Sequence, residues 1–273
     1  MDGESLWNGK SLGAIGGGNM AEALVRGVIR AGLLSPERIC VFDISPERLS
    51  VFSGLGCRTA ESAAGVLDAH VVLLATKPQN VREALEDVPL RDGQVLVSIL
   101  AGVSTAAMES LLPAGARVVR TMPNTPLLVG KGMTALAGGK SATADDVATA
   151  VALFACSGDA VEVNEGDLDA VTALSGSGPA YLFRFAETLM VGAERIGLDP
   201  ELAKRLAIGM LAGSAEMLAR DGDAPALRHR VTSPGGTTAA ALAVLEDGDF
   251  EGLVGRALRA ACERSAELGK GNL

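Results

Sequence analysis

The sequence predicts a two-part protein in which a parallel α/β domain over residues 1–163 is followed by an all-α domain over residues 164–273. Three observations support this. A glycine-rich turn near the N-terminus lies between a short apolar run and a helical pattern. Further apolar runs then alternate with helical patterns, as they do in parallel sheets. After about Asn164 the strand-like runs stop, and alanine- and leucine-rich helical stretches continue to the C-terminal end.

The glycine-rich turn is typical of a site for a dinucleotide pyrophosphate. It follows an apolar run over residues 11–15 and precedes a helical pattern over residues 20–31. Gly16 permits the tight turn, Gly18 lets the backbone approach the phosphates, and Ala21 lets the helix pack against the strand. The N-terminal N–H groups of the helix then face the anion. We therefore expect residues 1–163 to form a Rossmann-type dinucleotide-binding domain.

The second predicted strand, Arg38 to Asp43, ends in a carboxylate at the position that usually holds the adenosine ribose. An acid there favours NADH. Ser45 and Arg48 follow within one turn, and both are placed to contact a 2'-phosphate, so NADPH fits as well. Ser45 fits equally well as the N-cap of a helix that begins at Pro46. The sequence leaves both alternatives open.

The remaining elements continue the alternation between strands and helices. We expect strands at Val71–Ala75, Val95–Leu100, Arg117–Thr121, Met133–Ala137 and Ala160–Val163, and helices at Pro46–Gly54, Val81–Asp87, Thr105–Leu112 and Ala144–Cys156. Right-handed crossovers place the carboxyl ends of parallel strands at one edge of the sheet, where ligands bind.

Two loops at that edge contain candidate cofactor contacts. Lys77 lies in the loop Thr76–Gln79, and Asn124 lies in the turn Met122–Pro126. Both side chains are placed to hydrogen-bond the nicotinamide ribose or carboxamide. Each also has an ordinary explanation, because lysines are commonly solvated and asparagine is common in turns.

Composition excludes several classes of protein. A net charge of -9 and a pI near 4.9 argue against a nucleic-acid partner. No apolar stretch is long enough to span a membrane, and the acidic start Met1–Glu4 does not resemble a signal peptide. Four scattered cysteines and two isolated histidines indicate neither a metal site nor a disulfide framework. We expect a cytoplasmic protein.

The C-terminal part predicts a homodimer. We expect helices at Leu168–Ile196, Pro200–Ala219, Thr237–Asp247 and Phe250–Leu268. Several of them have apolar residues on more than one face, and a helical domain of this size cannot bury all of those faces alone. Interleaved helices of a second copy would cover them.

Two turns interrupt these helices. The segment Ala173–Tyr181 is typical of a broken helix or a close-packing turn. In the segment Ser233–Thr238, the N–H groups of Gly235, Gly236 and Thr237 precede a helix and form a candidate anion site. A carboxylate fits better than a phosphate because no cluster of basic residues is nearby. A simple helix start after a Gly-Gly turn explains the same residues.

Five motifs together resemble the pyrroline-5-carboxylate reductase family. They are Gly16-x-Gly18-x-x-Ala21, Lys77-Pro78-Gln79, Met122-Pro123-Asn124-Thr125-Pro126, Ser175-Gly176-Ser177-Gly178-Pro179-Ala180-Tyr181 and Val231-Thr232-Ser233-Pro234-Gly235-Gly236-Thr237-Thr238. Their order is that of the family over nearly the whole chain. The last motif is the most specific.

The resemblance implies NADH- or NADPH-dependent reduction of 1-pyrroline-5-carboxylate to L-proline, the last step of proline synthesis. It implies that Thr172 faces the ring nitrogen as a hydrogen-bond or proton donor, although a helix threonine bonded to its own backbone also fits. It also implies that the substrate carboxylate contacts Ser233, Gly235, Gly236, Thr237 and Thr238. The cofactor contacts that we expect are Gly16, Gly18, Asn19, Met20, Asp43, Ser45, Arg48, Ala75, Thr76, Lys77, Pro78 and Asn124.

Other consequences of the resemblance are less specific. The expected assembly is a homodimer, or a larger homo-oligomer built from dimers. Family members usually have an acidic residue before the second glycine-rich turn, and Asp221 and Asp223 are both candidates. The segment that contains them is one residue shorter than the family pattern, and a solvated loop is the simpler interpretation of both.

Two rival functions are less well supported. β-Hydroxyacid dehydrogenases typically place a lysine four residues after a G-x-G turn, and this chain has Leu182 there. A sensor that binds a dinucleotide without catalysis would not need the carboxylate site at Gly235 and Gly236.

Overall fold

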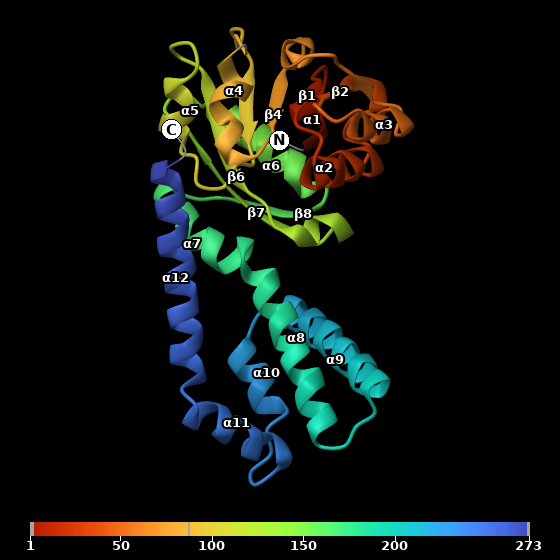
Figure 1. Cartoon of the computed structure of the whole chain (residues 1–273), viewed down its shortest axis with the longest axis vertical. Helices are drawn as coiled ribbons and strands as arrows, with labels where there is room; N and C mark the ends of the chain where they lie inside the picture. Colours follow the sequence, from red (N-terminus) through yellow and green to blue (C-terminus); the bar gives the residue numbers. More distant parts are fainter. Residues whose placement is uncertain (1–2, 87, 272–273) are drawn as a thin grey trace. The chain divides into compact units, whose positions relative to one another are not determined.

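The computed structural model describes residues 3–86 and 88–271, and the chain folds into two compact units (Figure 1). The first unit comprises the chain up to Ser177 together with its end from Ala260. The second unit comprises Gly178–Arg259. Each unit is described by itself.

The first unit is built on one sheet with the strand order β3-β2-β1-β4-β5-β6-β7-β8. The strands are β1 Leu12–Ile15, β2 Ile39–Phe42, β3 Arg58–Thr59, β4 Val71–Leu74, β5 Val95–Ser98, β6 Arg117–Met122, β7 Gly132–Gly138 and β8 Gly158–Glu162. Every predicted strand is confirmed. The short edge strand β3 was not predicted because its two residues are exposed and polar.

The sheet is parallel, as predicted, except where β7 pairs with β6. Strands β1 to β6 pair in parallel, whereas β7 is antiparallel to β6, with Thr121 opposite Leu136. Residues 123–131 connect the two strands and contain only a 3₁₀ turn, Thr125–Val129. A parallel return needs a crossover helix, so the chain turns back instead. Strand β8 then runs parallel to β7 after a helix.

The helices of the first unit are α1 Gly3–Trp7, α2 Asn19–Arg30, α3 Pro46–Gly54, α4 Val81–Glu86, α5 Thr105–Ser110, α6 Ala144–Ala155 and α7 Leu168–Val171. The predicted bounds of α3 are confirmed. The predicted end of α4 at Asp87 lies outside the described residues. Helix α1 was not predicted, and its Trp7 is buried with the indole N–H donating to the carbonyl of Thr149 at 3.0 Å.

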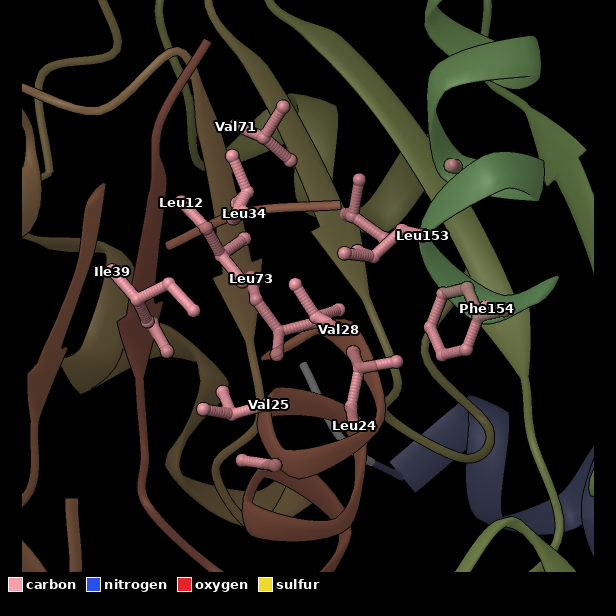
Figure 2. Packing of buried hydrophobic residues seen from close by; sticks show 14 of the residues in the cluster. Leu12, Leu24, Val25, Val28, Leu34, Ile39, Val71, Leu73, Leu153 and Phe154 are labelled. Carbon is pink, nitrogen blue, oxygen red and sulfur yellow. The ribbon is translucent and has the colours of Figure 1, made fainter. Parts of the chain in front are cut away.

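The core fills both faces of the sheet, which explains why the strands are uniformly apolar. One face packs against α2 and α6, with Leu73 of β4 among the buried residues in Figure 2. On the other face, Leu74 packs in a cluster with Val81 and Leu85 of α4 and with Met108 of α5. Successive residues of β4 therefore belong to different clusters.

The second unit is helical, as predicted. Its helices are α8 Gly178–Arg195, α9 Pro200–Asp221, α10 Ala224–Arg230, α11 Thr237–Asp247 and the first part of α12 Phe250–Gly271. The helix predicted over Leu168–Ile196 is not continuous, because a π-helical turn at Thr172–Gly176 separates α7 from α8. This break agrees with the turn predicted in the same segment.

Helix α10 occupies part of a segment in which we expected a solvated loop. Asp223 caps it, since its Oδ1 accepts a hydrogen bond from the Ala226 N–H at 2.9 Å. Asp221 forms an ion pair with Arg230 at the other end of α10. Within the described residues, no helix combines the length and the apolar character that crossing a membrane requires.

Candidate functional site

The glycine-rich turn joins β1 to α2 in a backbone geometry that requires glycine. Gly16 has φ +100°, and a Cβ there would lie 2.5 Å from the carbonyl oxygen of Ala75. Gly18 is the N-cap of α2 without a side-chain cap, and a Cβ there would meet open space. The first N–H groups of α2, from Asn19 and Met20, therefore remain available to an anion.

Asp43 braces this turn directly. Its Oδ2 accepts a hydrogen bond from the Gly17 N–H at 2.6 Å, and its Oδ1 accepts one from the Ser45 N–H at 2.8 Å. An ionised carboxylate has about four lone-pair positions, so acceptor capacity is left for a ribose hydroxyl. The carboxylate thus links the end of β2 to the glycine turn.

Arg48 contacts the same turn from α3. Its Nε donates to the Gly17 carbonyl at 2.5 Å, and its guanidinium forms an ion pair with Glu22 of α2 at 2.7 Å. Hydrogen bonds from Arg26 and from Arg48 hold the pKa of Glu22 below its ordinary value. Both predicted charged groups, Asp43 and Arg48, therefore lie at the turn.

Ser45 is the N-cap of α3, which confirms one of its two interpretations. Its Oγ accepts from the Arg48 N–H at 3.3 Å and donates to Glu47 Oε2 at 2.6 Å. This bond lowers the pKa of Glu47. A phosphate contact by Ser45 stays a prediction.

The loop after β4 lies against the glycine turn, with the Ala75 N–H donating to the Ile15 carbonyl at 2.8 Å. The Thr76 hydroxyl is buried and has no hydrogen-bond partner among the described residues. A buried orphan hydroxyl is costly unless something binds it, so it fits a polar group of a bound dinucleotide. Lys77 is exposed at the loop, and Pro78 begins a 3₁₀ turn.

Asn124 has a structural role that sequence reasoning missed. Its Nδ2 donates to the carbonyl and to the Oγ of Ser175, each at 3.2 Å, and its Oδ1 accepts from the Met133 N–H at 2.9 Å. The side chain thus holds the π-helical turn against the start of β7. Its predicted contact with the cofactor is not tested by these bonds.

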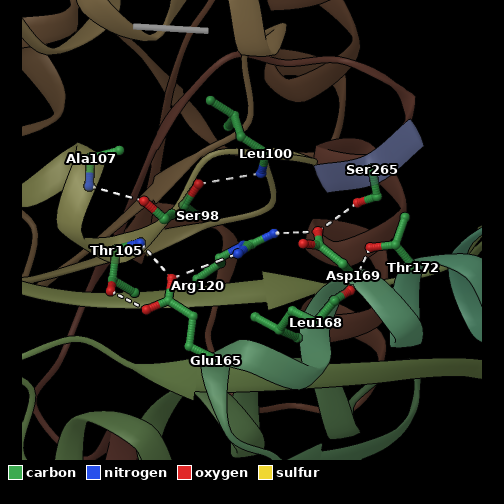
Figure 3. A network of polar contacts seen from close by, with 11 residues as sticks. Ser98, Leu100, Thr105, Ala107, Arg120, Glu165, Leu168, Asp169, Thr172 and Ser265 are labelled. Carbon is green, nitrogen blue, oxygen red and sulfur yellow. Dashed lines mark hydrogen bonds and ion pairs between the residues drawn. The ribbon is translucent and has the colours of Figure 1, made fainter. Parts of the chain in front are cut away.

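Thr172 begins the π-helical turn, and its hydroxyl donates to the Leu168 carbonyl at 2.7 Å (Figure 3). This is the backbone bond expected of an ordinary helix threonine. A hydroxyl has one proton and two lone pairs, so Thr172 Oγ1 retains the ability to accept a hydrogen bond. Gly176 is the last residue of the turn, and a Cβ there would lie 2.6 Å from Met122 Cε, so the Met122 side chain would have to move.

A buried arginine, which sequence reasoning also missed, supports this segment. Arg120 of β6 lies 3.6 Å from Glu165 and 3.7 Å from Asp169 of α7 (Figure 3). The Ser265 hydroxyl of α12 donates to Asp169 at 2.7 Å, and Thr105 donates to Glu165 through both its N–H and its hydroxyl. The one feature of the sequence that could have indicated this arginine is a charged residue inside the apolar pattern of a predicted strand.

The second glycine-rich turn belongs to the second unit. Gly235 has φ +68°, and Gly236 is the N-cap of α11. The Gly236 N–H donates to the Ser233 carbonyl at 3.0 Å and closes the turn. We expected this N–H to be available to an anion, and it is not. The N–H groups of Thr237 and Thr238 begin the helix and lack intrahelical acceptors.

Helix caps distinguish the two glycine turns from the other helix starts. Side chains cap α3, α5, α6, α9 and α10. By contrast, α2 and α11 begin at a glycine without a side-chain cap. Of the described helices with eight or more residues and an assigned N-cap, these two alone lack a side-chain cap. They are the two starts at which the sequence predicts an anion.

The histidines and cysteines are outside these sites. His70 accepts from the Ser11 N–H at 3.2 Å. Burial raises the pKa of the Cys57 thiol to about 11. The part of the chain that the structure describes contains no cluster of residues suited to a metal ion.

Comparisons with known proteins match both parts of the chain. The family described as "Pyrroline-5-carboxylate reductase dimerisation" matches residues 165–268, and the one described as "NADP oxidoreductase coenzyme F420-dependent" matches residues 11–102. The pyrroline-5-carboxylate reductase of Corynebacterium melassecola is 42% identical over 269 residues, which cover 95% of this chain and 99% of that protein. Pyrroline-5-carboxylate reductase 2 of Bacillus subtilis is 36% identical and covers 95% of each chain.

Solved structures that are similar to this chain are also pyrroline-5-carboxylate reductases. The pyrroline-5-carboxylate reductase of Coxiella burnetii has a TM-score of 0.89 and 38% identity, covering 95% of this chain and 98% of that one. The Plasmodium falciparum pyrroline carboxylate reductase, solved with NADP bound, has a TM-score of 0.84 and 31% identity, covering 95% and 98%.

Proposed function

The chain belongs to the pyrroline-5-carboxylate reductase family, and from this premise we propose that it reduces 1-pyrroline-5-carboxylate to L-proline with NADH or NADPH. The observation that carries the proposal is the pair of uncapped, glycine-started helices, α2 and α11. One helix start suits the pyrophosphate of a dinucleotide, and the other suits the carboxylate of the substrate.

The first unit would bind the cofactor, which supplies the hydride when bound. The Gly16–Gly18 turn admits the pyrophosphate, and the orphan hydroxyl of Thr76 fits a polar partner. Asp43 keeps lone pairs for a ribose hydroxyl. The proposed contacts are Gly16, Gly18, Asn19, Met20, Asp43, Ser45, Arg48, Ala75, Thr76, Lys77, Pro78 and Asn124.

The segment Ser233–Thr238 would bind the substrate carboxylate. The N–H groups of Thr237 and Thr238 and the positive end of the α11 dipole favour an anion at this point. A Cβ at Gly236 would lie 2.4 Å from Ser233 Oγ and 3.1 Å from the Ser233 carbonyl oxygen, so a larger residue would crowd the turn. The proposed contacts are Ser233, Gly235, Thr237 and Thr238, together with Gly236, which shapes the turn and does not donate its N–H to the carboxylate.

Thr172 would hold the substrate nitrogen. The reaction adds hydride to the imine carbon, and the electron pair of the C=N bond moves to a nitrogen that already bears its proton. The resemblance implies that Thr172 donates to the ring nitrogen, but its hydroxyl proton is already donated to the Leu168 carbonyl. We therefore propose instead that Thr172 Oγ1 accepts a hydrogen bond from the N–H of the protonated imine. Arg120 fixes α7 through Asp169, and α7 leads directly into Thr172.

The proposed assembly is a homodimer formed through the all-helical part, or a larger homo-oligomer built from such dimers. The matching family is itself described as a dimerisation family. We propose that residues 1–163 bind the cofactor and that residues 164–273 bind the substrate and the second copy. The proposed location is the cytoplasm, where cysteines without a pairing pattern stay reduced.

The decisive experiment follows the oxidation of NADH and of NADPH by the purified protein, with and without 1-pyrroline-5-carboxylate, and detects proline. Substrate-dependent oxidation with stoichiometric proline is the expected result. Cofactor binding without proline would contradict the reductase function and favour a sensor.

Two variants test the assigned residues. Thr238→Ala is expected to raise the substrate KM more than it lowers kcat, because the carboxylate is bound in both ground and transition states. Thr188→Ala, an exposed helix threonine bonded to Arg184, is the matched control. An unchanged KM in Thr238→Ala would remove this residue from the site.

Thr172→Val keeps the side-chain shape but removes the hydroxyl. The expected result is a kcat lowered roughly tenfold to a hundredfold, as for the loss of a hydrogen bond to a charged group. The cofactor Kd should not change. A kcat equal to that of the parent would contradict the role of Thr172.

A further inference from the structure

Glu22 occupies an unusual place at the cofactor turn. It lies in the first turn of α2, where its two carboxylate oxygens contact different arginines. Oε1 contacts Arg26 Nε at 2.8 Å, and Oε2 contacts the Arg48 guanidinium at 2.7 Å. Arg48 comes from α3, so this ion pair joins the helix that follows the glycine turn to the helix that follows Asp43.

The Arg48 guanidinium is held at more than one point. Besides Glu22, its Nε donates to the Gly17 carbonyl at 2.5 Å, and its Cζ lies 6.0 Å from the centre of the Phe52 ring. The side chains of Arg48 and Glu22 are both about three-quarters buried, with 26% and 22% exposure. Such a pair is less screened by solvent than a fully exposed one.

The charges around the end of β2 decide which dinucleotide fits. A 2'-phosphate carries a charge of roughly -1.5 to -2 at neutral pH and is normally matched by arginine or lysine. Between residues 43 and 54, Arg48 is the only basic residue in the sequence, and Asp43 and Glu47 are acidic. Glu22 offsets the one positive charge that this segment supplies.

We propose that Glu22 determines the cofactor preference, because its ion pair with Arg48 withholds the guanidinium from a 2'-phosphate and makes the chain select NAD(H) over NADP(H). The inference rests on the proposed function, since it concerns the adenosine end of the same cofactor site. Asp43 adds to the preference by accepting a ribose hydroxyl and repelling a phosphate. Glu22 acts at a distance from the reacting atoms, through Arg48.

The test measures the Kd of NAD⁺ and of NADP⁺ by isothermal titration calorimetry, without substrate, for the parent chain and for Glu22→Gln. The parent is expected to bind NAD⁺ more tightly. In Glu22→Gln, the affinity for NADP⁺ relative to NAD⁺ should rise by about tenfold, as for one gained hydrogen bond between charged groups. An unchanged ratio, or a parent that binds NADP⁺ more tightly, would overturn the inference.

Two further variants separate the release of Arg48 from a simple change in charge. Glu37→Gln removes the same charge from the 3₁₀ turn Pro36–Arg38, which precedes β2 at the opposite end of the strand from Asp43. In this variant the affinity for NADP⁺ relative to NAD⁺ should stay within about twofold of the parent. The double variant Glu22→Gln with Arg48→Met should lose the gain, because no guanidinium remains to be released. A shift in Glu37→Gln as large as that in Glu22→Gln, or a gain that survives in the double variant, would overturn the inference.

The readout also distinguishes this inference from the proposed function. Binding of neither dinucleotide by the parent would contradict the cofactor site itself. Binding of both with a ratio that Glu22→Gln leaves unchanged would contradict only the role of Glu22.

Discussion

In the first unit, strands such as β1 and β4 are fully buried, and the side chains of β4 pack into a cluster on each face of the sheet. In the second unit, helices α8 and α9 leave large apolar side chains exposed, and the buried apolar residues described there are Ala203 and Ala207. One unit therefore has a core of its own. The other has the composition of a core but lacks the burial, which is what a helical interface between two copies requires.

The exposed side chains of α9 form a regular stripe. Leu202, Leu206 and Met210 are spaced by four residues, and each is about half exposed. Residues four apart lie on one face of a helix, so a partner helix can cover them together. A substitution within this stripe is therefore the most direct test of the proposed interface between two copies.

The largest effect is expected for Leu206→Asp. A charge placed in a buried apolar interface is strongly unfavourable, so the variant should be monomeric at micromolar concentration and lose reductase activity. Sedimentation equilibrium and activity assays measure both. The matched control is Val129→Asp, which changes an exposed apolar residue of the first unit and should leave the dimer intact. A dimeric Leu206→Asp would contradict the proposed interface.

A smaller effect is expected for a truncation within the core of the first unit. Leu73 is fully buried, so Leu73→Ala should lower the free energy of unfolding by about 2–5 kcal/mol through lost burial and a residual cavity. Denaturant unfolding measures the loss. Unlike Leu206→Asp, this variant should remain dimeric while folded. A loss below about 1 kcal/mol would show that the site relaxes around the missing atoms.

Ion pairs extend the comparison. Arg120 is buried in the first unit, whereas Arg256 pairs with Asp249 on the surface of the second, where both side chains are about two-thirds exposed. Arg120→Met should lower the free energy of unfolding by about 1–3 kcal/mol. This loss is smaller than that expected from breaking a fully buried ion pair, because Glu165 and Asp169 are partly solvated. The free energy of unfolding of Arg256→Met should stay within about 0.5 kcal/mol of that of the parent. Equal losses in denaturant unfolding would contradict the distinction.

In both units the sequence predicts local features better than features that depend on tertiary contacts. Periodicity and caps suffice for α3 and α11, whose predicted bounds are confirmed, because both ends of each helix are encoded locally. The reversal of β7 was missed because strand direction depends on the connection and not on the strand pattern. Arg120 was missed because its partners are brought together only by tertiary folding.

The candidate site shows the same difference between features encoded locally and contacts that form only on folding. The glycine turns around Gly16 and Gly236 were predictable, since each combines a special backbone geometry with a helix start. The bonds of Asn124 to Ser175 and to Met133 were not, because an asparagine in a turn has many compatible partners. Which partner it takes is decided by packing between segments that are far apart in the sequence.

The smallest expected effect is a change in the reactivity of the Cys57 thiol. Cys57 is buried in the first unit, so its reactivity depends on how often the core of that unit opens. Burial raises its pKa to about 11 from an ordinary 9.0, so the folded state favours the neutral thiol. The corresponding stabilisation is complete below pH 9 and is lost as the pH rises from 9 to 11, where the unfolded thiol ionises first. At pH 8, Cys57 should therefore react slowly with a thiol reagent in the native protein.

Mass spectrometry of labelled peptides measures the rate at Cys57, with the unfolded protein as the reference. The rate should be the same in the parent and in Leu206→Asp, because loss of the dimer leaves the core of the first unit closed. It should rise in Leu73→Ala, because opening of that core becomes less costly. Faster labelling of Cys57 in Leu206→Asp would mean that the first unit depends on the dimer, and the two units would then be one cooperative structure.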